Sequence, residues 1–240
     1  MGSQPTVTLP QVGHSRIETV LGQRQPLTHE TFLVSLNDRT GNLRLNADSL
    51  GLALSGVVLG ELVLSRYLAV DGRSLTPLRR DLPTHPFLAP RFARMLAEPD
   101  IADVSTWLRF FATDAVSDTA QELQARGWLS VERRRSLSLR SRLTYWPVKS
   151  GDVAWRSVRL AVVLSGLDQY LRQGHPIPWH EVLLAELLDV VGLLDTVLWD
   201  SPRDDCRSWL RWCLDQHHGL RALIYEAATT HASMIRSHLT

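Results

Sequence analysis

The sequence predicts a mainly α protein: a single helical domain with apolar central helices, wrapped by amphipathic helices and loops, and one projecting β-hairpin. Two observations favour helix. Apolar runs of helical length occur near residues 50–68, 153–173 and 178–199, and the 240 residues contain no internal repeat or low-complexity linker. One segment, about residues 128–146, alternates in the manner of strands.

The first part of the chain divides into an arm and two helices. Residues 1–26 mix Pro, Gly, Gln and Thr without periodicity and predict a flexible arm, so the domain is residues 27–240. Thr28 is the expected N-cap of a helix "HETFLVSLN" that ends at the turn "DRTGN". Asp48 or Ser49 then caps "LGLALSGVVLGELVLSRYL", which is apolar on nearly all sides and is predicted to be the enclosed central helix.

The middle of the chain is predicted to be irregular before it becomes helical again. Four prolines between residues 77 and 90 favour loop or short extended pieces. Helices are expected near residues 90–97, 103–112 and 118–126, the last with Gly127 at its C-terminal end.

The second half is predicted to hold the hairpin and three helices. "WLSVE" and "SLSLRSRLTYW" read as two strands joined by a loop at residues 133–136. The helices are expected at about residues 153–173, 178–199 and 204–235, the last broken near Gly219. Four leucines of the apolar runs are predicted to lie in the core: Leu59, Leu62, Leu187 and Leu194.

Two cysteines and two apolar stretches have structural explanations. Cys206 and Cys213 are seven residues apart, about 10 Å along a helix, so they are expected to be reduced core thiols. The stretches 50–64 and 182–199 are short or interrupted by acidic residues, which favours buried helices over membrane spans. No signal-peptide pattern is visible, and a cytoplasmic protein is expected.

The standard signatures of catalysis and metal binding are missing from the sequence. "HEVLL" and "HETFL" lack the second histidine of a zincin motif, and no phosphate-binding glycine loop or GxSxG elbow occurs. The expectation is a protein that is not an enzyme and has no cofactor and no metal site.

Positive charge is concentrated in one region. Residues 126–159 hold nine basic and two acidic residues, whereas the whole chain has a net charge of +1. Nearby aromatic residues are Trp128, Tyr145, Trp146 and Trp155. This combination suits an anionic membrane surface, but it also fits a solvated basic hairpin. Nucleic acid is the least favoured partner, because the pI is only 7.9 and no nucleic-acid-binding motif appears.

The order of several segments resembles that of a known family. "TFLVSLNDRTGNLRL", "LALSGVVLGELVLSRYL", "AQELQARGWLSVE" and "YWPVKSGDVAWRSVRLAVVLSGL" together resemble the Golgi phosphoprotein 3 (GPP34-like) family, as a bacterial-type member, over about residues 28–235. The resemblance implies a single helical domain with a projecting hairpin. It also implies peripheral binding to phosphatidylinositol 4-phosphate or related anionic lipids, without catalysis.

The chain departs from the family at the headgroup pocket. The family's Trp and three Arg positions are expected at Asn46, Ser55, Thr113 and Val116, and none matches. The predicted lipid-binding residues are therefore the arginines of the hairpin with one outlying residue, namely Arg133, Arg134, Arg135, Arg140, Arg142 and Arg44.

The predicted function is that of a peripheral protein which binds anionic membrane lipids on the inner face of the membrane. The alternative is an interaction adaptor without significant lipid affinity, which holds a protein partner or self-associates through the hairpin.

Overall fold

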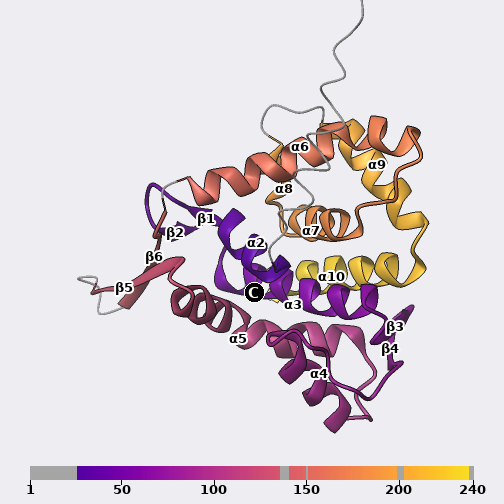
Figure 1. Cartoon of the computed structure of the whole chain (residues 1–240). Helices are drawn as coiled ribbons and strands as arrows, with labels where there is room; N and C mark the ends of the chain where they lie inside the picture. Colours follow the sequence, from indigo (N-terminus) through magenta and orange to yellow (C-terminus); the bar gives the residue numbers. More distant parts are fainter. Residues whose placement is uncertain (1–25, 136–140, 150, 199–202, 238–240) are drawn as a thin grey trace, which may run out of the picture.

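The computed structural model describes residues 26–135, 141–149, 151–198 and 203–237, and 64% of it is helical (Figure 1). The strands form small two-stranded antiparallel sheets. The predicted mainly α fold is therefore confirmed. The predicted arm, residues 1–26, lies outside the described residues except for Pro26.

Each of the three strand pairs in the described residues lies between two helices in the chain, and the last part of the chain is helical. The first half consists of α2 (Leu27–Val34), β1 (Leu36–Asn37), β2 (Asn42–Leu43), α3 (Ala47–Leu64), β3 (Leu68–Asp71), β4 (Ser74–Pro77), α4 (Leu88–Ala97) and α5 (Val104–Ala125). The second half consists of β5 (Leu129–Arg135), β6 (Ser141–Pro147), α6 (Asp152–Arg172), α7 (Trp179–Val190), α8 (Leu194–Val197), α9 (Arg203–Asp215) and α10 (His218–Ser237).

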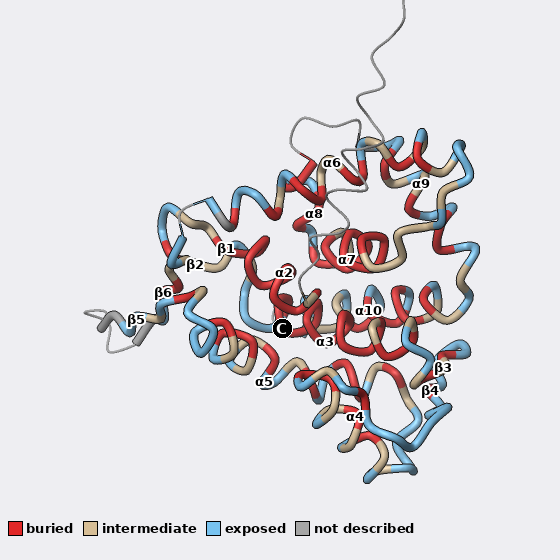
Figure 2. The backbone as a smooth tube through the Cα atoms, in the orientation of Figure 1, coloured by how far each residue is buried: buried red, intermediate tan, exposed pale blue. Residues whose placement is uncertain are grey.

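Helix α3 is the centre of the molecule, and α2, α5, α7 and α10 contact it (Figure 1). It is long and apolar enough to cross a membrane, but 78% of it is buried inside the protein. Most of its residues are coloured as buried in Figure 2. The predicted core positions Leu59, Leu62, Leu187 and Leu194 are all fully buried. These observations confirm α3 as the enclosed central helix.

Glycines in α3 let the neighbouring helices approach closely. A Cβ atom on Gly51 would lie 2.4 Å from the backbone oxygen of Ala112 in α5. Cβ atoms on Gly56 and Gly60 would meet the side chains of Leu187 and Leu183 in α7 at 2.5 and 2.4 Å. The absence of side chains at these three positions therefore sets the spacing between α3, α5 and α7.

An ion-pair network is buried where α2, α6 and α7 meet. The guanidinium of Arg159 donates to Glu30 in α2 at 2.6 Å and to Glu181 in α7 at 2.8 Å. All three residues are 2% exposed. Arg156, one turn earlier in α6, lies 3.9 Å from the other Glu30 oxygen. The charged residues of this part of α6 therefore point inward.

Two predicted helix caps are wrong. Helix α2 begins at Leu27 after Pro26, so Thr28 lies inside the helix and is buried. Helix α3 is capped by Asn46, whose side chain accepts from the Ser49 backbone N–H at 2.7 Å, and neither Asp48 nor Ser49 is the cap. The capping residue therefore precedes the predicted one in both cases.

The lengths of three other elements also differ from the expectation. The helices expected at 103–112 and 118–126 are one continuous helix, α5, and Gly127 follows it with a φ of +69° as predicted. The helix expected at 178–199 ends at Val190, since Gly192 adopts a φ of +76°. The break in the last helix is confirmed, but it falls just before His218.

The expectation that strand is confined mainly to one hairpin is too narrow. Strands β3 and β4 pair around Gly72, which has a φ of +55° after Asp71. Asp-Gly is a common hairpin turn, so the sequence carried this signal. A shorter pairing, β1 with β2, encloses the "DRTG" turn. The two cysteines are buried and free, as predicted.

The close contact at Gly51 generates the first prediction. Gly51→Ala is expected to lower the free energy of unfolding by about 1–3 kcal/mol, since the added methyl group meets an α5 carbonyl that cannot rotate away. Gly219→Ala in α10 is the control, because its Cβ would lie 3.5 Å from the nearest atoms and the change should cost nothing. Denaturant unfolding measures both. Equal stability of the two variants would contradict the proposed contact.

The buried network generates the second prediction. Arg159→Met takes away the guanidinium that Glu30 and Glu181 share, and a loss of about 3–5 kcal/mol in unfolding free energy is expected. Arg172→Met is the control on the same helix. Arg172 pairs with Asp168 on the surface, where such a pair contributes less than about 1 kcal/mol. A small effect of Arg159→Met would show that the network is not important for stability.

A buried carboxyl on α7 generates the third prediction. Burial, reinforced by the Asp189 carboxylate and opposed by Arg211, raises the pKa of Glu186 from 4.5 to about 7. The folded state therefore binds a proton more tightly than the unfolded state. The resulting stability is complete below about pH 4.5 and is lost as the pH rises through 7.

Glu186→Gln should remove this dependence. Its unfolding free energy relative to the natural protein is expected to rise by roughly 2–3 kcal/mol between pH 4.5 and 8, as measured by denaturant unfolding at each pH. A difference that stays constant with pH would show that the Glu186 carboxyl titrates normally.

Candidate basic hairpin surface

The β5–β6 hairpin is seated on a small core of its own. Leu129 of β5 and Tyr145 of β6 are buried with residues of α2, α5 and the start of α6, including Phe32 and Val153. The Tyr145 and Phe32 rings meet edge to face at 5.3 Å between centroids. Beyond this base the hairpin projects from the body of the molecule (Figure 1). The predicted projecting hairpin is therefore confirmed.

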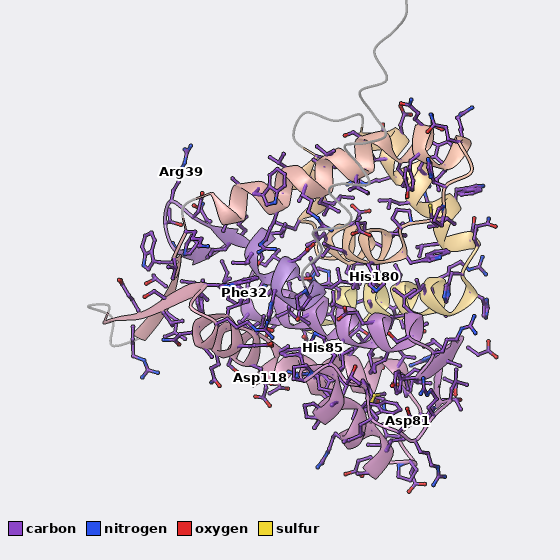
Figure 3. The ribbon with its side chains drawn as sticks, viewed as in Figure 1. Phe32, Arg39, Asp81, His85, Asp118 and His180 are labelled. Atoms are coloured by element: carbon purple, nitrogen blue, oxygen red, sulfur yellow. The ribbon has the colours of Figure 1, made fainter. Side chains whose placement is uncertain are left out.

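The turn between β1 and β2 packs against the second strand of the hairpin. The Tyr145 backbone N–H donates to the Gly41 carbonyl at 2.7 Å. A Cβ on Gly41 would lie 2.8 Å from the Trp146 ring, and its φ of +68° also favours glycine. This contact places Arg39, which is exposed in the same turn, at the hairpin end of the molecule (Figure 3).

The first turns of α6 pack against the foot of the hairpin on another side. The Val148 N–H donates to the Trp128 carbonyl at 3.0 Å, where Trp128 directly precedes β5. The Arg156 guanidinium lies 5.3 Å from the centroid of the Trp128 ring. The β1–β2 turn, the hairpin and the start of α6 therefore form one continuous end of the molecule, called the basic end below.

The predicted lipid-binding arginines of the hairpin lie in strands rather than in the loop expected at residues 133–136. Arg133, Arg134 and Arg135 belong to β5 and Arg142 to β6, because the ladder extends to the pair Arg135–Ser141. Arg133 is exposed. Arg140 lies outside the described residues.

The strand register pairs two arginine positions. Arg134 is paired directly with Arg142 across the ladder, and Arg133 is paired with Leu143. Like charges directly opposite each other destabilise a two-stranded ladder. The stability of the hairpin therefore does not explain why arginine occupies these positions.

Arg44, the outlying predicted residue, follows β2. It is exposed, its backbone N–H donates to Ser35 at 2.7 Å, and its Nε donates to the Leu36 carbonyl at 3.3 Å. Sequence reasoning left out Arg39 and Lys149, both exposed at the basic end. Lys149 was within the region of concentrated charge, but only the packing of Gly41 on Trp146 reveals the place of Arg39.

The charge of the predicted basic region is not all on the surface. Arg156 and Arg159 are buried against acidic residues, and Arg126 pairs with Glu122 at 2.8 Å. In contrast, four basic side chains of the basic end make no ion pair within the described part of the chain: Arg39, Arg44, Arg133 and Lys149. Exposed basic side chains without an ion pair also occur elsewhere in the described residues, at Arg66, Arg80, Arg109, Arg211 and Arg236, so what distinguishes the basic end is the excess of basic over acidic residues in its sequence.

The four positions expected at the family's headgroup pocket have structural roles or apolar contacts. Asn46 caps α3, the Ser55 hydroxyl donates to the Gly51 carbonyl at 2.8 Å, and the Thr113 hydroxyl donates to the Arg109 carbonyl. Val116 packs against the core beneath the hairpin. None of the four supplies a positive charge, so these residues do not build a basic headgroup pocket.

The described residues contain hollows away from the hairpin but no metal centre. Among these residues, no three His, Cys, Asp or Glu side chains gather as a metal-binding group. A groove of about 680 Å³ lies between β4 and α4, far from the hairpin, and its lining is apolar apart from Arg79 and Arg80. Arg79 is already bonded to Asp81. Another hollow, of about 350 Å³ between α6 and α9, has polar lining at Asp168, Arg172 and Asp205, where Arg172 is already bonded to Asp168. The basic end is therefore the strongest candidate for a functional surface.

Comparison with known proteins agrees with this arrangement of elements. A family model described as Golgi phosphoprotein 3 (GPP34) matches residues 27–224. No curated protein matches the chain at a significant level.

Proposed function

Because the chain belongs to the Golgi phosphoprotein 3 family, we propose that it binds anionic phospholipid headgroups as a peripheral membrane protein. The contact is made by the basic end, and the preferred lipids resemble phosphatidylinositol 4-phosphate. The family is not known as a family of enzymes, and we propose that this member acts by binding rather than by catalysis.

The uncompensated charge of the basic end is the observation that carries the proposal. Arg39, Arg133 and Lys149 are exposed there without an ion-pair partner in the described part of the chain, and residues 126–159 hold nine basic but only two acidic residues. An anionic bilayer supplies the missing counter-charges. The family pocket residues are not matched, so this mode of binding relies on the field of several arginines rather than on one enclosed headgroup.

The expected strength of this attraction fits a reversible contact. A basic residue near an anionic membrane surface contributes about 1 kcal/mol, so three to five engaged residues supply roughly 3–5 kcal/mol. The attraction weakens with salt, because the Debye length falls from about 10 Å at 0.1 M to about 3 Å at 1 M. Anionic lipids are concentrated in the cytoplasmic leaflet, so the proposed location is the inner face of the membrane.

The fourth prediction tests this contact by charge reversal. Arg133→Glu/Arg134→Glu/Arg135→Glu is expected to abolish co-sedimentation with phosphatidylcholine vesicles that contain anionic lipid at 0.1 M salt. Arg172→Glu/Arg211→Glu/Arg221→Glu is the matched control, with the same change of charge on α6, α9 and α10 at the end away from the hairpin (Figure 1). The control should bind like the natural protein.

Lipid preference needs a comparison at equal surface charge. Vesicles with phosphatidylinositol 4-phosphate and vesicles with phosphatidylserine are matched in total charge, and stronger binding to the former supports the finer proposal. If the natural protein ignores both, or the hairpin variant binds as well as the control, the lipid function is wrong. The adaptor function, with a protein partner or a second copy on the hairpin, then replaces it.

A further inference from the structure

Helix α6 departs from an ordinary surface helix, because its inward side holds arginines among apolar residues such as Leu160 and Leu164, and its outer side carries no charge between Val153 and Leu167. Between Val153 and Leu167 its only charged residues are Arg156 and Arg159, and both are buried. Its exposed or half-buried side carries apolar residues at helical spacing: Ala154, Trp155, Val158, Ala161 and Val162. Trp155 is 48% exposed and Val158 is 42% exposed. A surface helix normally turns its charged side to water.

The buried arginines fix this orientation. Arg159 binds Glu30 and Glu181, and Arg156 lies over the Trp128 ring. With 3.6 residues per turn, holding these two positions inward turns Val158 outward and leaves Trp155, which is 48% exposed, at the edge of the outward side. The apolar stripe is therefore a fixed feature of the folded protein, and it alternates with buried residues along α6 in Figure 2.

The apolar stripe continues the basic end. Val148, 59% exposed, and Lys149 link β6 to α6. Trp155 follows Lys149 by six residues, and Arg156 next to it contacts the foot of the hairpin. The stripe therefore begins where the unpaired positive charges lie. Arg39 projects at the same end of the molecule (Figure 3).

We propose that the apolar stripe of α6, centred on Trp155 and Val158, inserts into the interfacial layer of an anionic bilayer while the basic end binds its headgroups. The inference rests on the proposed function and adds a second, apolar contact to it. Tryptophan favours the boundary between headgroups and acyl chains. An apolar side flanked by basic residues is the pattern of segments that lie in this boundary. The charge of the neighbouring surface favours an anionic bilayer over an uncharged apolar partner.

The fifth prediction separates the apolar contact from the electrostatic one. Trp155→Ser/Val158→Ser should lower the partition coefficient onto vesicles of phosphatidylcholine and phosphatidylserine by about 10-fold, by a similar factor at each salt concentration. The hairpin triple variant should instead flatten the dependence on salt. Trp212→Ser/Tyr225→Ser is the control, because these residues are 45% and 69% exposed on α9 and α10. It should bind like the natural protein.

Fluorescence quenching by brominated lipids reports insertion directly. The natural protein should be quenched when it binds, and Trp155→Phe should lose the quenched fraction whereas Trp212→Phe keeps it. If the serine variant binds normally while the hairpin variant does not, the insertion is wrong and the proposed function stands. If the natural protein binds no anionic vesicle, both are wrong.

The other partner to be tested for the apolar stripe of α6 is a second copy of the chain. If sedimentation shows a dimer that Trp155→Ser/Val158→Ser dissociates, the stripe is an interface between copies and the insertion is overturned. If binding falls in the serine variant without quenching of the natural protein, insertion is likewise overturned.

Discussion

The orientation of α6 depends on the guanidinium of Arg159, which joins three helices at one buried point. It bonds carboxylates that come from α2 and α7, so these elements cannot shift relative to one another without breaking a charged contact in the core. Burying such charges costs desolvation energy, which the paired geometry must offset. An apolar core would pack these helices together as well, but it would specify the rotation of α6 less strictly. This network and the buried apolar residues Leu160, Leu164 and Leu167 together set the position of α6.

The sequence predicted the architecture well where apolar residues recur over long runs. Leu59 and Leu187 were placed in the core correctly because their helices are apolar on nearly all sides. Helix ends were predicted less well, since several neighbouring polar residues compete as caps and only the backbone geometry selects one. Asn46 was selected for α3, although Asp48 and Ser49 have equally suitable side chains. The joining of two predicted helices into α5 reflects packing against α3, which no local pattern reports.

For the candidate site, the sequence located the charge but not which charges reach the surface. Arg156 and Arg159 raise the apparent charge of the region, but the buried carboxylates Glu30 and Glu181 neutralise them from positions distant in the chain. Periodicity assigns arginine to the solvent side of a helix, so the burial of two arginines among the core residues of α6 could not be predicted. The placement of Arg133 at the basic end was predicted. The presence of Arg39 there depends on a contact between Gly41 and Trp146, more than a hundred residues apart.

The hairpin consists of two strands, so each strand leaves one side of its backbone without a ladder partner in the β5–β6 sheet. Open strand edges invite pairing between molecules, and natural proteins discourage such aggregation with charged residues on the edges. The arginines in the sequence of β5 and β6 are residues of the type that natural edge strands use for this purpose. Neutral replacements would therefore remove a membrane contact and a safeguard against aggregation together. Replacement of these arginines by glutamate removes the membrane contact but keeps a charge on the strand edge, so the safeguard against aggregation is retained.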